Sequence, residues 1–466
     1  MKTWNQLFTR QGFMVKEIES NEFVCTTETE ENMSFLLESL SGVGVDYSYS
    51  DETNFLILIS EPVSEEEWIE VVDFKYRGRG EGLWFQPGVE EPKVRDLDTH
   101  ISGIIRQLNR LGLYTTHCCE GHLTRGPIIG FHNKDDMKIV AKLFQAVGLK
   151  EKEMRVTYST LFLRTKRADL LNLGEKISII QQEWLEESLE FIRKQLFNHQ
   201  LEELLSIDGE SGDEEQIRSF VMERLTPHVD NLAIDGYGNI LAQKTYRSGN
   251  GPTILLNAHL DTIFGFEPNR HIVKDGPIWS SSEGILGADD RAGVAVLLEV
   301  AETLSQSTFN GTVKFVFTVE EEVGLVGARH VDEYFLWDVD AAIVVDRRGS
   351  GDIVTSCGGY IDYCHKNYSE FFETVAKKEN LGDWKCVAGG SSDTRVWASH
   401  GIHSVNFSVG YWNEHTDEEM LNVDACYKTS KLITGVFQYS RELASKLREI
   451  KTNKKRNNKE FIFLRG

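Results

Sequence analysis

The spacing of apolar residues changes along the chain, which predicts two folded domains. Up to about residue 170, strand-like runs such as Phe55 to Ile59 and Leu161 to Leu163 mix with helical runs such as Ile101 to Leu111 and Met137 to Val147. This mixture is typical of an α+β unit. The expected segments are an α+β domain at 1–173, a connecting helix at 174–205, a second domain at 198–450 and a basic tail at 451–466.

The connecting segment carries apolar residues at helical spacing. They are Leu185, Leu189, Ile192 and Leu196, with charged residues between them. Residues spaced in this way share one face of an α-helix. We therefore predict one long amphipathic helix between the two domains.

Beyond Ser206, short β-branched runs alternate with helical patterns. These runs are Thr253–Asn257, Val313–Thr318, Ala341–Val345 and Ser404–Val409. Strands separated by helices form a mostly parallel sheet that helices cover on both faces. The second domain is therefore predicted as a three-layer α/β/α fold, in which ligands gather at the carboxyl ends of the strands.

Acidic residues or histidines follow the end of each of these runs. His259 and Asp261 follow the first run, Glu320 to Glu322 the second and Asp346 the third, and His415 lies beyond the fourth. A further helical pattern is preceded by Asp289 and Asp290. Because the strand ends share one edge of the sheet, we expect these side chains to meet there.

Composition and charge narrow the function classes. The 466 residues are 40% apolar and 26% charged, with a formal net charge of -23. The acidic balance argues against a nucleic-acid partner, because phosphates need clustered Lys and Arg.

No run approaches the roughly 20 apolar residues of a membrane span, and the first residues lack the apolar part of a secretory signal, so we expect a cytoplasmic protein without a membrane partner. The seven cysteines have no regular spacing, which argues against a disulfide framework. The basic tail is interpreted as a solvated, frayed end.

Carboxylates gathered at one edge repel one another unless cations bind between them. Two unpaired carboxylates roughly 4 Å apart cost about 4 kcal/mol at an effective dielectric of about 20. Asp289, at a helix start, can share its two oxygens between two cations. His259 and Asp346 would complete one ion site, and Glu322 and His415 the other. These ligands suit two divalent ions, with zinc as the first expectation and cobalt or manganese as alternatives.

Two acidic neighbours of these ligands are predicted to be catalytic. Asp261, two residues after His259 on a strand, can accept the second imidazole N–H. Glu321 is free to act as the general base for a water that the metals activate. Glu320 is expected to be solvated. His400 and His403 are alternatives to His415 as the ligand.

Five ordered motifs resemble a known group of enzymes. The motifs are HLD (259–261), GADDRAG (287–293), EEVGLVGA (321–328), VVD (344–346) and EHT (414–416). They resemble the dinuclear zinc metallopeptidases of the M20, M28 and M42 families. SGDEE (211–215) and DGYGNILA (235–242) are similar to the way M20 and M42 catalytic domains begin. The intervals between the motifs are too short for the domains that M42 and M20 enzymes insert, so the compact layout resembles M28 most.

The resemblance implies a phosphorylase/hydrolase-like fold and metal-assisted amide hydrolysis, with an aminopeptidase acting on a peptide or small amide as the first interpretation. It also implies a cis peptide bond between Asp289 and Asp290. Asp393 lies in a loop expected near the substrate, and Arg395 could meet a substrate carboxylate or form only a surface ion pair.

Two alternatives to the aminopeptidase interpretation stay open. One is an M20-like deacylase or dipeptidase acting on small N-acylated or modified amino compounds, and the other is a non-catalytic module that keeps metals for structure.

The N-terminal half contains one notable cluster, His117, Cys118, Cys119 and His122. Adjacent cysteines point apart on a strand and chelate poorly, so buried thiols are expected and a third metal site is the alternative. This half could select substrates, cover the site or mediate assembly, which leaves a homo-oligomer open.

Overall fold

The computed structural model describes residues 2–463 except 76, 79–84 and 122–124. It divides into two compact units, residues 1–196 and 197–466. Within the described residues, no helix is both long and apolar enough to cross a membrane.

The first unit contains two four-stranded antiparallel sheets, in the orders β1-β2-β4-β3 and β5-β6-β8-β7. Its strands are β1 (Lys16–Glu19), β2 (Glu22–Val24), β3 (Tyr47–Ser50), β4 (Phe55–Leu58), β5 (Thr115–Cys119), β6 (Ile128–Phe131), β7 (Met154–Val156) and β8 (Thr160–Leu163). Its helices are α1 (Trp4–Arg10), α2 (Glu30–Val43), α3 (Glu65–Val72), α4 (Ser102–Arg110), α5 (Met137–Ala146) and α6 (Asp169–Ile179). The predicted α+β class is confirmed.

Separate apolar cores hold the two sheets of this unit. Trp4, Phe8 and Trp68 belong to the core beside the first sheet. Phe144 and Leu161 belong to the core beside the second. Burial of these large side chains supplies most of the driving force that orders each sheet.

The prediction of one helix over 174–205 is wrong. Helix α6 ends at Ile179, and Ile180 has extended backbone. A short 3₁₀ turn follows at Gln182–Glu186, and α7 then runs from Leu189 to Leu205. The Ser188 hydroxyl accepts the N–H of Phe191 at 3.1 Å. This bond caps a new helix, which is why the apolar spacing does not continue as one helix.

The second unit is built on a nine-stranded mixed sheet in the order β17-β16-β19-β15-β11-β14-β10-β9, with β18 paired to β16. The pairs β19/β15, β15/β11 and β11/β14 are parallel. The strands are β9 (Asn231–Ile234), β10 (Ile240–Tyr246), β11 (Thr253–His259), β14 (Gly311–Thr318), β15 (Ala341–Arg347), β16 (Asp352–Cys357), β17 (Ile361–Asp362), β18 (Lys385–Gly389) and β19 (His403–Ser408). A small antiparallel sheet contains β12 (Ile272–Asp275), β13 (Ile278–Ser281), β20 (Tyr411–Trp412) and β21 (Met420–Asn422).

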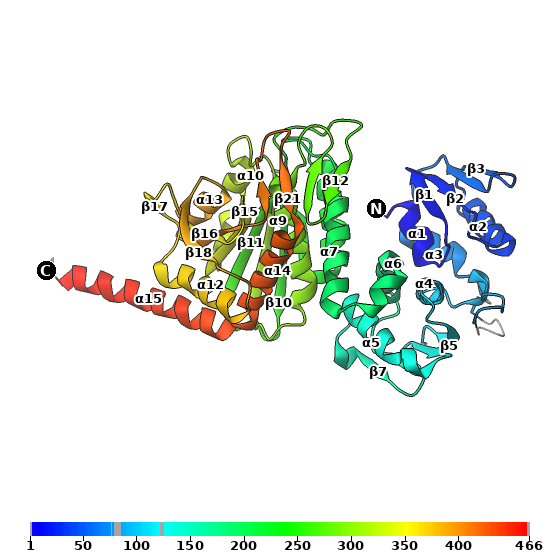
Figure 1. The fold of residues 1–466 in the computed structure, drawn as a ribbon. Coiled ribbons are helices and arrows are strands. Elements are labelled where there is room, and N and C mark those ends of the chain that lie inside the picture. The colour runs from blue at the N-terminus through cyan, green and yellow to red at the C-terminus, as the bar shows by residue number, and fades with distance from the viewer. Residues whose placement is uncertain (1, 76, 79–84, 122–124, 464–466) are drawn as a thin grey trace. The chain divides into compact units, whose positions relative to one another are not determined.

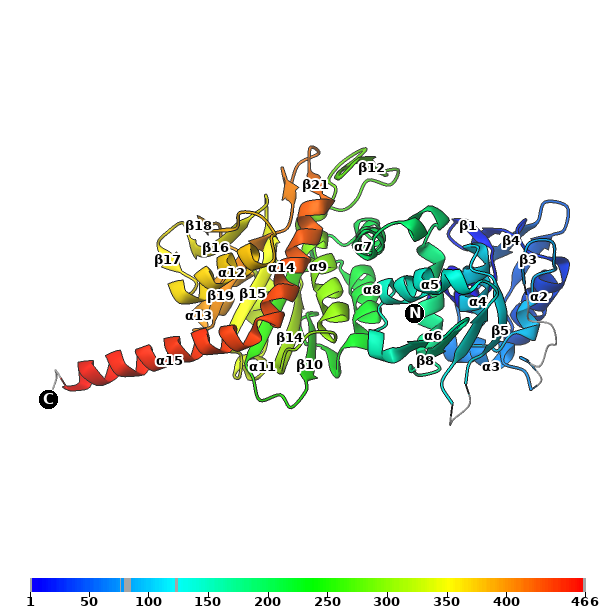
Figure 2. The same ribbon diagram turned by 60° about the horizontal axis from the view of Figure 1, so that its bottom comes forward.

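Helices cover both faces of the large sheet, as predicted (Figure 1). They are α8 (Glu215–Leu225), α9 (Ala288–Leu304), α10 (Val326–His330), α11 (Glu333–Leu336), α12 (Lys366–Lys378), α13 (Asp393–Ser399) and α14 (Val423–Gln438). Ile254 and Leu256 of β11 face the core beneath α9 and α14, which run side by side in Figure 2. Leu255, between them, faces the core beneath α10 and α13. The period-2 alternation of a strand thus buries both faces and gives the α/β/α layers.

The basic tail also differs from expectation, because α15 extends from Ser440 to Phe463. The segment lacks Gly and Pro and is rich in Lys and Glu. These residues are good helix formers, so the chain continues as a helix instead of fraying.

Candidate metal centre

Three neighbouring strands bring the predicted ligands to one edge of the sheet. The strands β15, β11 and β14 are adjacent and parallel, so their carboxyl ends lie together. His259 is the last residue of β11, Asp346 is near the end of β15, and Glu321 and Glu322 follow β14. His415 arrives from the loop between β20 and β21.

Asp289 lies between the two imidazoles. Its Oδ1 is 3.1 Å from Nε2 of His259, and its Oδ2 is 3.4 Å from Nε2 of His415. Nε2 of His259 is also 3.8 Å from Oδ1 of Asp346, and Nε2 of His415 is 2.8 Å from Oε1 of Glu322. The five expected ligands therefore converge, and each oxygen of Asp289 faces one of two neighbouring sets.

Glu419 fixes the backbone at Gly287 and Asp289. The carboxylate of Glu419 accepts the N–H groups of Gly287 at 2.8 Å and of Asp289 at 3.0 Å. The bond between Asp289 and Asp290 is cis, as the resemblance implied, and both residues have non-helical backbone at the start of α9. The sequence analysis missed Glu419, whose only signal was an acidic residue four positions after His415.

Asp290 supports the backbone of the site. Its Oδ2 accepts the N–H of His259 at 3.2 Å, and its Oδ1 accepts that of Gly293 at 3.0 Å. Both oxygens of Asp290 are thus engaged by backbone groups, whereas those of Asp289 face imidazole nitrogens. This difference favours Asp289 over Asp290 as the shared ligand.

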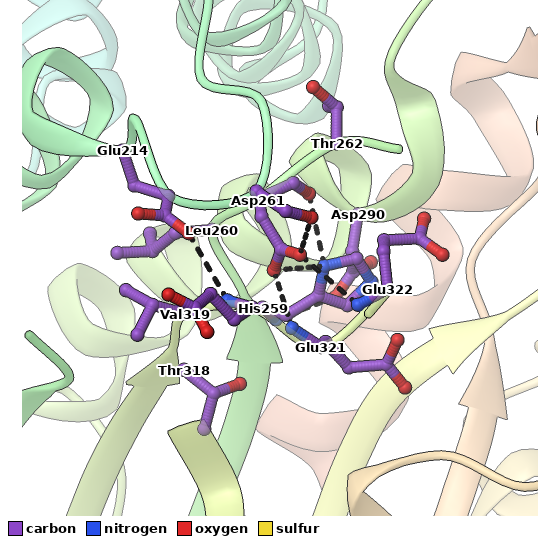
Figure 3. Close-up of polar contacts among 12 residues, drawn as sticks. Glu214, His259, Leu260, Asp261, Thr262, Asp290, Thr318, Val319, Glu321 and Glu322 are labelled. Carbon is purple, nitrogen blue, oxygen red and sulfur yellow. Dashed lines mark hydrogen bonds and ion pairs between the residues drawn. The ribbon is translucent and has the colours of Figure 1, made fainter. Parts of the chain in front are cut away.

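Asp261 connects His259 to the segment after β14 (Figure 3). Nδ1 of His259 lies 3.3 Å from Oδ1 of Asp261 and 3.1 Å from its backbone oxygen. The two carboxylate oxygens of Asp261 accept the N–H groups of Glu321 at 3.0 Å and of Glu322 at 3.1 Å. One carboxylate therefore orients an imidazole and also fixes the backbone that carries Glu321.

Burial and neighbouring charges raise the pKa values of three of these groups. Burial raises the pKa of Glu321 well above its usual range, and burial with the nearby Asp289 raises the pKa of Asp346 to about 7. Contacts with Asp289 and Glu322 raise the pKa of His415 to about 10. Such shifts are expected where several carboxylates are confined together without enough positive charge.

The donor set fits divalent cations. Among the described residues, two groups of three side chains lie close enough together to hold an ion, namely His259 with Asp290 and Asp346, and His259 with Asp289 and Glu322. Imidazole nitrogens and carboxylate oxygens are ligands that zinc accepts. A cation would replace the shared protons that the crowded acids otherwise need.

A cavity of about 170 Å³ opens beside these side chains. Its lining includes Asp289, Glu321, Glu322, Asp346 and His415. The remaining lining residues are Arg347, Arg348, Val354, Gly390, Ser391, Ser392, Asn406, Tyr411 and Glu414. Tyr411, which the sequence analysis did not single out as a site residue, donates its hydroxyl to Oδ1 of Asp346 at 3.1 Å.

Asp393 and Arg395 do not line this cavity. The Asp393 side chain is buried and accepts the hydroxyl of Thr318 at 2.5 Å, so it points into the protein from the start of α13. Arg395 is exposed on the same helix. The substrate contacts predicted for these two residues therefore have no counterpart in the cavity, where Gly390 to Ser392 of the same loop take that place.

The cysteine-rich cluster of the first unit forms no metal-ligand group among the residues that the structure describes. His117 is exposed, and its Nδ1 lies 3.0 Å from the hydroxyl of Thr116. Burial raises the pKa of the Cys118 thiol well above its usual range. His122 lies outside the described residues.

Comparisons with known proteins agree with this geometry. Residues 265–432 match the family model described as M42 glutamyl aminopeptidase. The predicted similarity to the M20, M28 and M42 group is thereby confirmed, although the matching family is M42 and the compact spacing had pointed to M28. In place of an inserted domain, the interval between His259 and Asp289 carries the β12–β13 hairpin.

Individual relatives match only part of the chain. "Uncharacterized protein YqjE" of Bacillus subtilis (strain 168) is 30% identical over 139 residues, which are 28% of this chain and 37% of that protein. A "Peptidase T-like protein" of Yersinia pestis is 25% identical over 158 residues, which are 27% of this chain and 38% of that protein. The solved structure of aminopeptidase PepT from Bacillus cereus ATCC 10987 is 19% identical, with a TM-score of 0.48, and the match covers 53% of this chain and 99% of that one.

Proposed function

We propose that the second unit is a dinuclear zinc aminopeptidase. The observation that carries this proposal is the position of Asp289, whose two oxygens face the imidazoles of His259 and His415. Asp346 and Glu322 lie beside those two imidazoles, so each set has a carboxylate of its own. The match of residues 265–432 to an M42 aminopeptidase family supports the same class of reaction.

The proposed ligands are His259, Asp289 and Asp346 for one ion and Asp289, Glu322 and His415 for the other. When bound, such ions polarise the scissile carbonyl and make water more acidic. Zinc is proposed over cobalt or manganese because imidazole and carboxylate ligands suit it best.

Glu321 is the proposed general base. It lines the cavity next to the ligand Glu322, and its N–H is fixed by Asp261. The Glu321 carboxylate would take a proton from the attacking water and return it to the leaving amine. Burial raises its pKa well above the usual range, which makes the carboxylate a stronger base. Asp261 would keep His259 in the tautomer that presents Nε2 to the metal side.

The cavity favours a small substrate. Its volume of about 170 Å³ is enough for one end of a peptide or for a small amide.

We extend the proposal to a cytoplasmic location. Whether the protein assembles as a homo-oligomer would be measured by light scattering.

The test is a panel of amino-acid amides, peptides with free amino termini and the same peptides carrying an acetyl cap. Each is assayed with metal-loaded and with chelated protein. We expect the metal-loaded protein to cleave the uncapped substrates and to lose this activity on chelation. Cleavage of the capped substrates alone would instead identify a deacylase or an endopeptidase. No cleavage of any substrate by metal-loaded protein would reject catalysis.

A further inference from the structure

The segment that carries Glu321 is held at four consecutive backbone positions by side chains from elsewhere. The N–H of Val319 donates to Oδ1 of Asn239 at 3.1 Å, and the N–H of Glu320 donates to Oε1 of Glu214 at 3.1 Å. The next two N–H groups, of Glu321 and Glu322, donate to Asp261. Figure 3 shows Glu214 and Asp261 approaching this segment from two separate parts of the chain.

These side-chain acceptors take the place of a neighbouring strand, because β14 has already ended at this point. Strand β14 ends at Thr318, so the following N–H groups have no strand partner. Glu320 has a φ of 50°, in the left-handed region that side-chain-bearing residues seldom adopt. A conformation of this kind persists only where the surroundings fix it. The side chains that accept the N–H groups of Val319 to Glu322 provide that constraint.

Glu214 is itself rigidly placed. Its side chain is only 4% exposed. Oε1 also accepts the N–H of Gly212 at 2.9 Å, and Oε2 lies 3.7 Å from the guanidinium of Arg218. A buried carboxylate with these partners has little freedom to rotate, so it can hold the N–H of Glu320 in one position.

The same stretch of chain also reaches Asp261. The N–H of Ser211 donates to the carbonyl of Thr262 at 3.1 Å, which aligns residues 209–214 with the end of β11. The Ser211 hydroxyl donates to Oδ2 of Asp261 at 2.7 Å. The SGDEE motif thus contacts the Glu321 segment twice, directly through Glu214 and indirectly through Asp261.

We infer that Glu214 is a positioning residue for Glu321: it fixes the backbone of Glu320 so that the next carboxylate faces the cavity. Glu214 is absent from the cavity lining, so it acts through the backbone and not on the substrate. The inference rests on the proposed role of Glu321 as general base. It gives the SGDEE motif, which supplies no ligand, a role in catalysis.

The kinetic test compares Glu214→Ala with Glu214→Gln in the full-length, zinc-loaded protein. Alanine leaves the N–H of Glu320 without an acceptor, whereas the glutamine carbonyl can still accept it. A displacement of about 1 Å at a reacting group costs about 100-fold in rate. We expect E214A to lower kcat by about 100-fold with little change in KM, and E214Q to stay within about tenfold of the unmodified protein because it keeps a neutral hydrogen bond.

Asp230→Ala is the matched control. Asp230 accepts the backbone N–H of Thr245 at 2.8 Å and pairs with Lys244 at 2.6 Å, in the same unit but outside the metal centre. Its loss removes the same kind of bond and should leave kcat unchanged. Equal kcat losses in E214A and D230A would indicate a general effect on folding and overturn the inference, and so would an E214A protein with full kcat.

Amide hydrogen exchange of the segment 318–327 separates this inference from the proposed function. We expect faster exchange at this segment in E214A than in E214Q, with the zinc content of both unchanged. Unchanged exchange in E214A would overturn the inference, whatever the activity. If the unmodified protein cleaves no substrate while E214A still loosens the segment, the proposed function fails and the structural part of the inference stands.

Discussion

The Nε2 atom of His415 lies 3.4 Å from Oδ2 of Asp289, although the two residues are 126 positions apart in the chain. This contact belongs to the proposed second ion site, so His415→Ala should remove one ion selectively. We expect the zinc content to fall from about two ions to about one per chain and activity to fall by about 100-fold. Metal analysis by mass spectrometry and a peptide assay measure these effects.

His400→Ala is the control for this change. His400 is exposed at the end of α13 and makes no contact with the site among the described residues. It should keep full zinc content and activity. Loss of metal in H400A, or its retention in H415A, would contradict the ligand assignment.

Glu321→Gln should abolish hydrolysis and leave metal binding intact. Glutamine keeps the shape of the side chain but cannot accept the proton from water. Removal of a general base costs about 100- to 10,000-fold in rate. The measurements are kcat on an uncapped peptide and zinc content. An E321Q protein that retains normal kcat would show that another group moves the proton.

Removal of the metal should lower the thermal stability of the second unit. Without cations, the buried carboxylates of Asp289, Glu322 and Asp346 repel one another, because too few positive charges lie beside them. A ligand present at 100 times its Kd stabilises the folded state by about 2.7 kcal/mol. We expect a chelator to lower Tm and zinc to restore it. Superimposable melting curves with chelator and with zinc would argue against a bound cation.

Gly293→Ala should destabilise the protein strongly. A Cβ at this position would lie 2.0 Å from the carbonyl oxygen of Val345 and 2.3 Å from Oδ1 of Asp290. Relieving such a clash requires movement of α9 away from β15, at a cost of about 3 kcal/mol. Gly236→Ala is the control, because nothing lies within 4 Å of its added Cβ. Chemical denaturation should show a loss of unfolding free energy in G293A only.

Several parts of the fold could be read from local patterns. The runs at Ile254–Leu256 and Val313–Phe317 alternate between two buried faces, which is the signature of strands covered on both sides. The prediction of one connecting helix was wrong because a new helix begins after Ser188, whose hydroxyl caps it. Periodicity of apolar residues carries no information about such a cap.

The sequence by itself determined which residues could bind cations, because acids and histidines follow each central strand and parallel strands end at one edge. Only the tertiary structure decided how the supporting groups are used. Three of these groups lie far in sequence from the residues that they contact, namely Glu419, Tyr411 and Glu214. Asp393 turned inward to Thr318 instead of toward the cavity. Side-chain direction depends on packing against distant segments, and that packing exists only once the chain has folded.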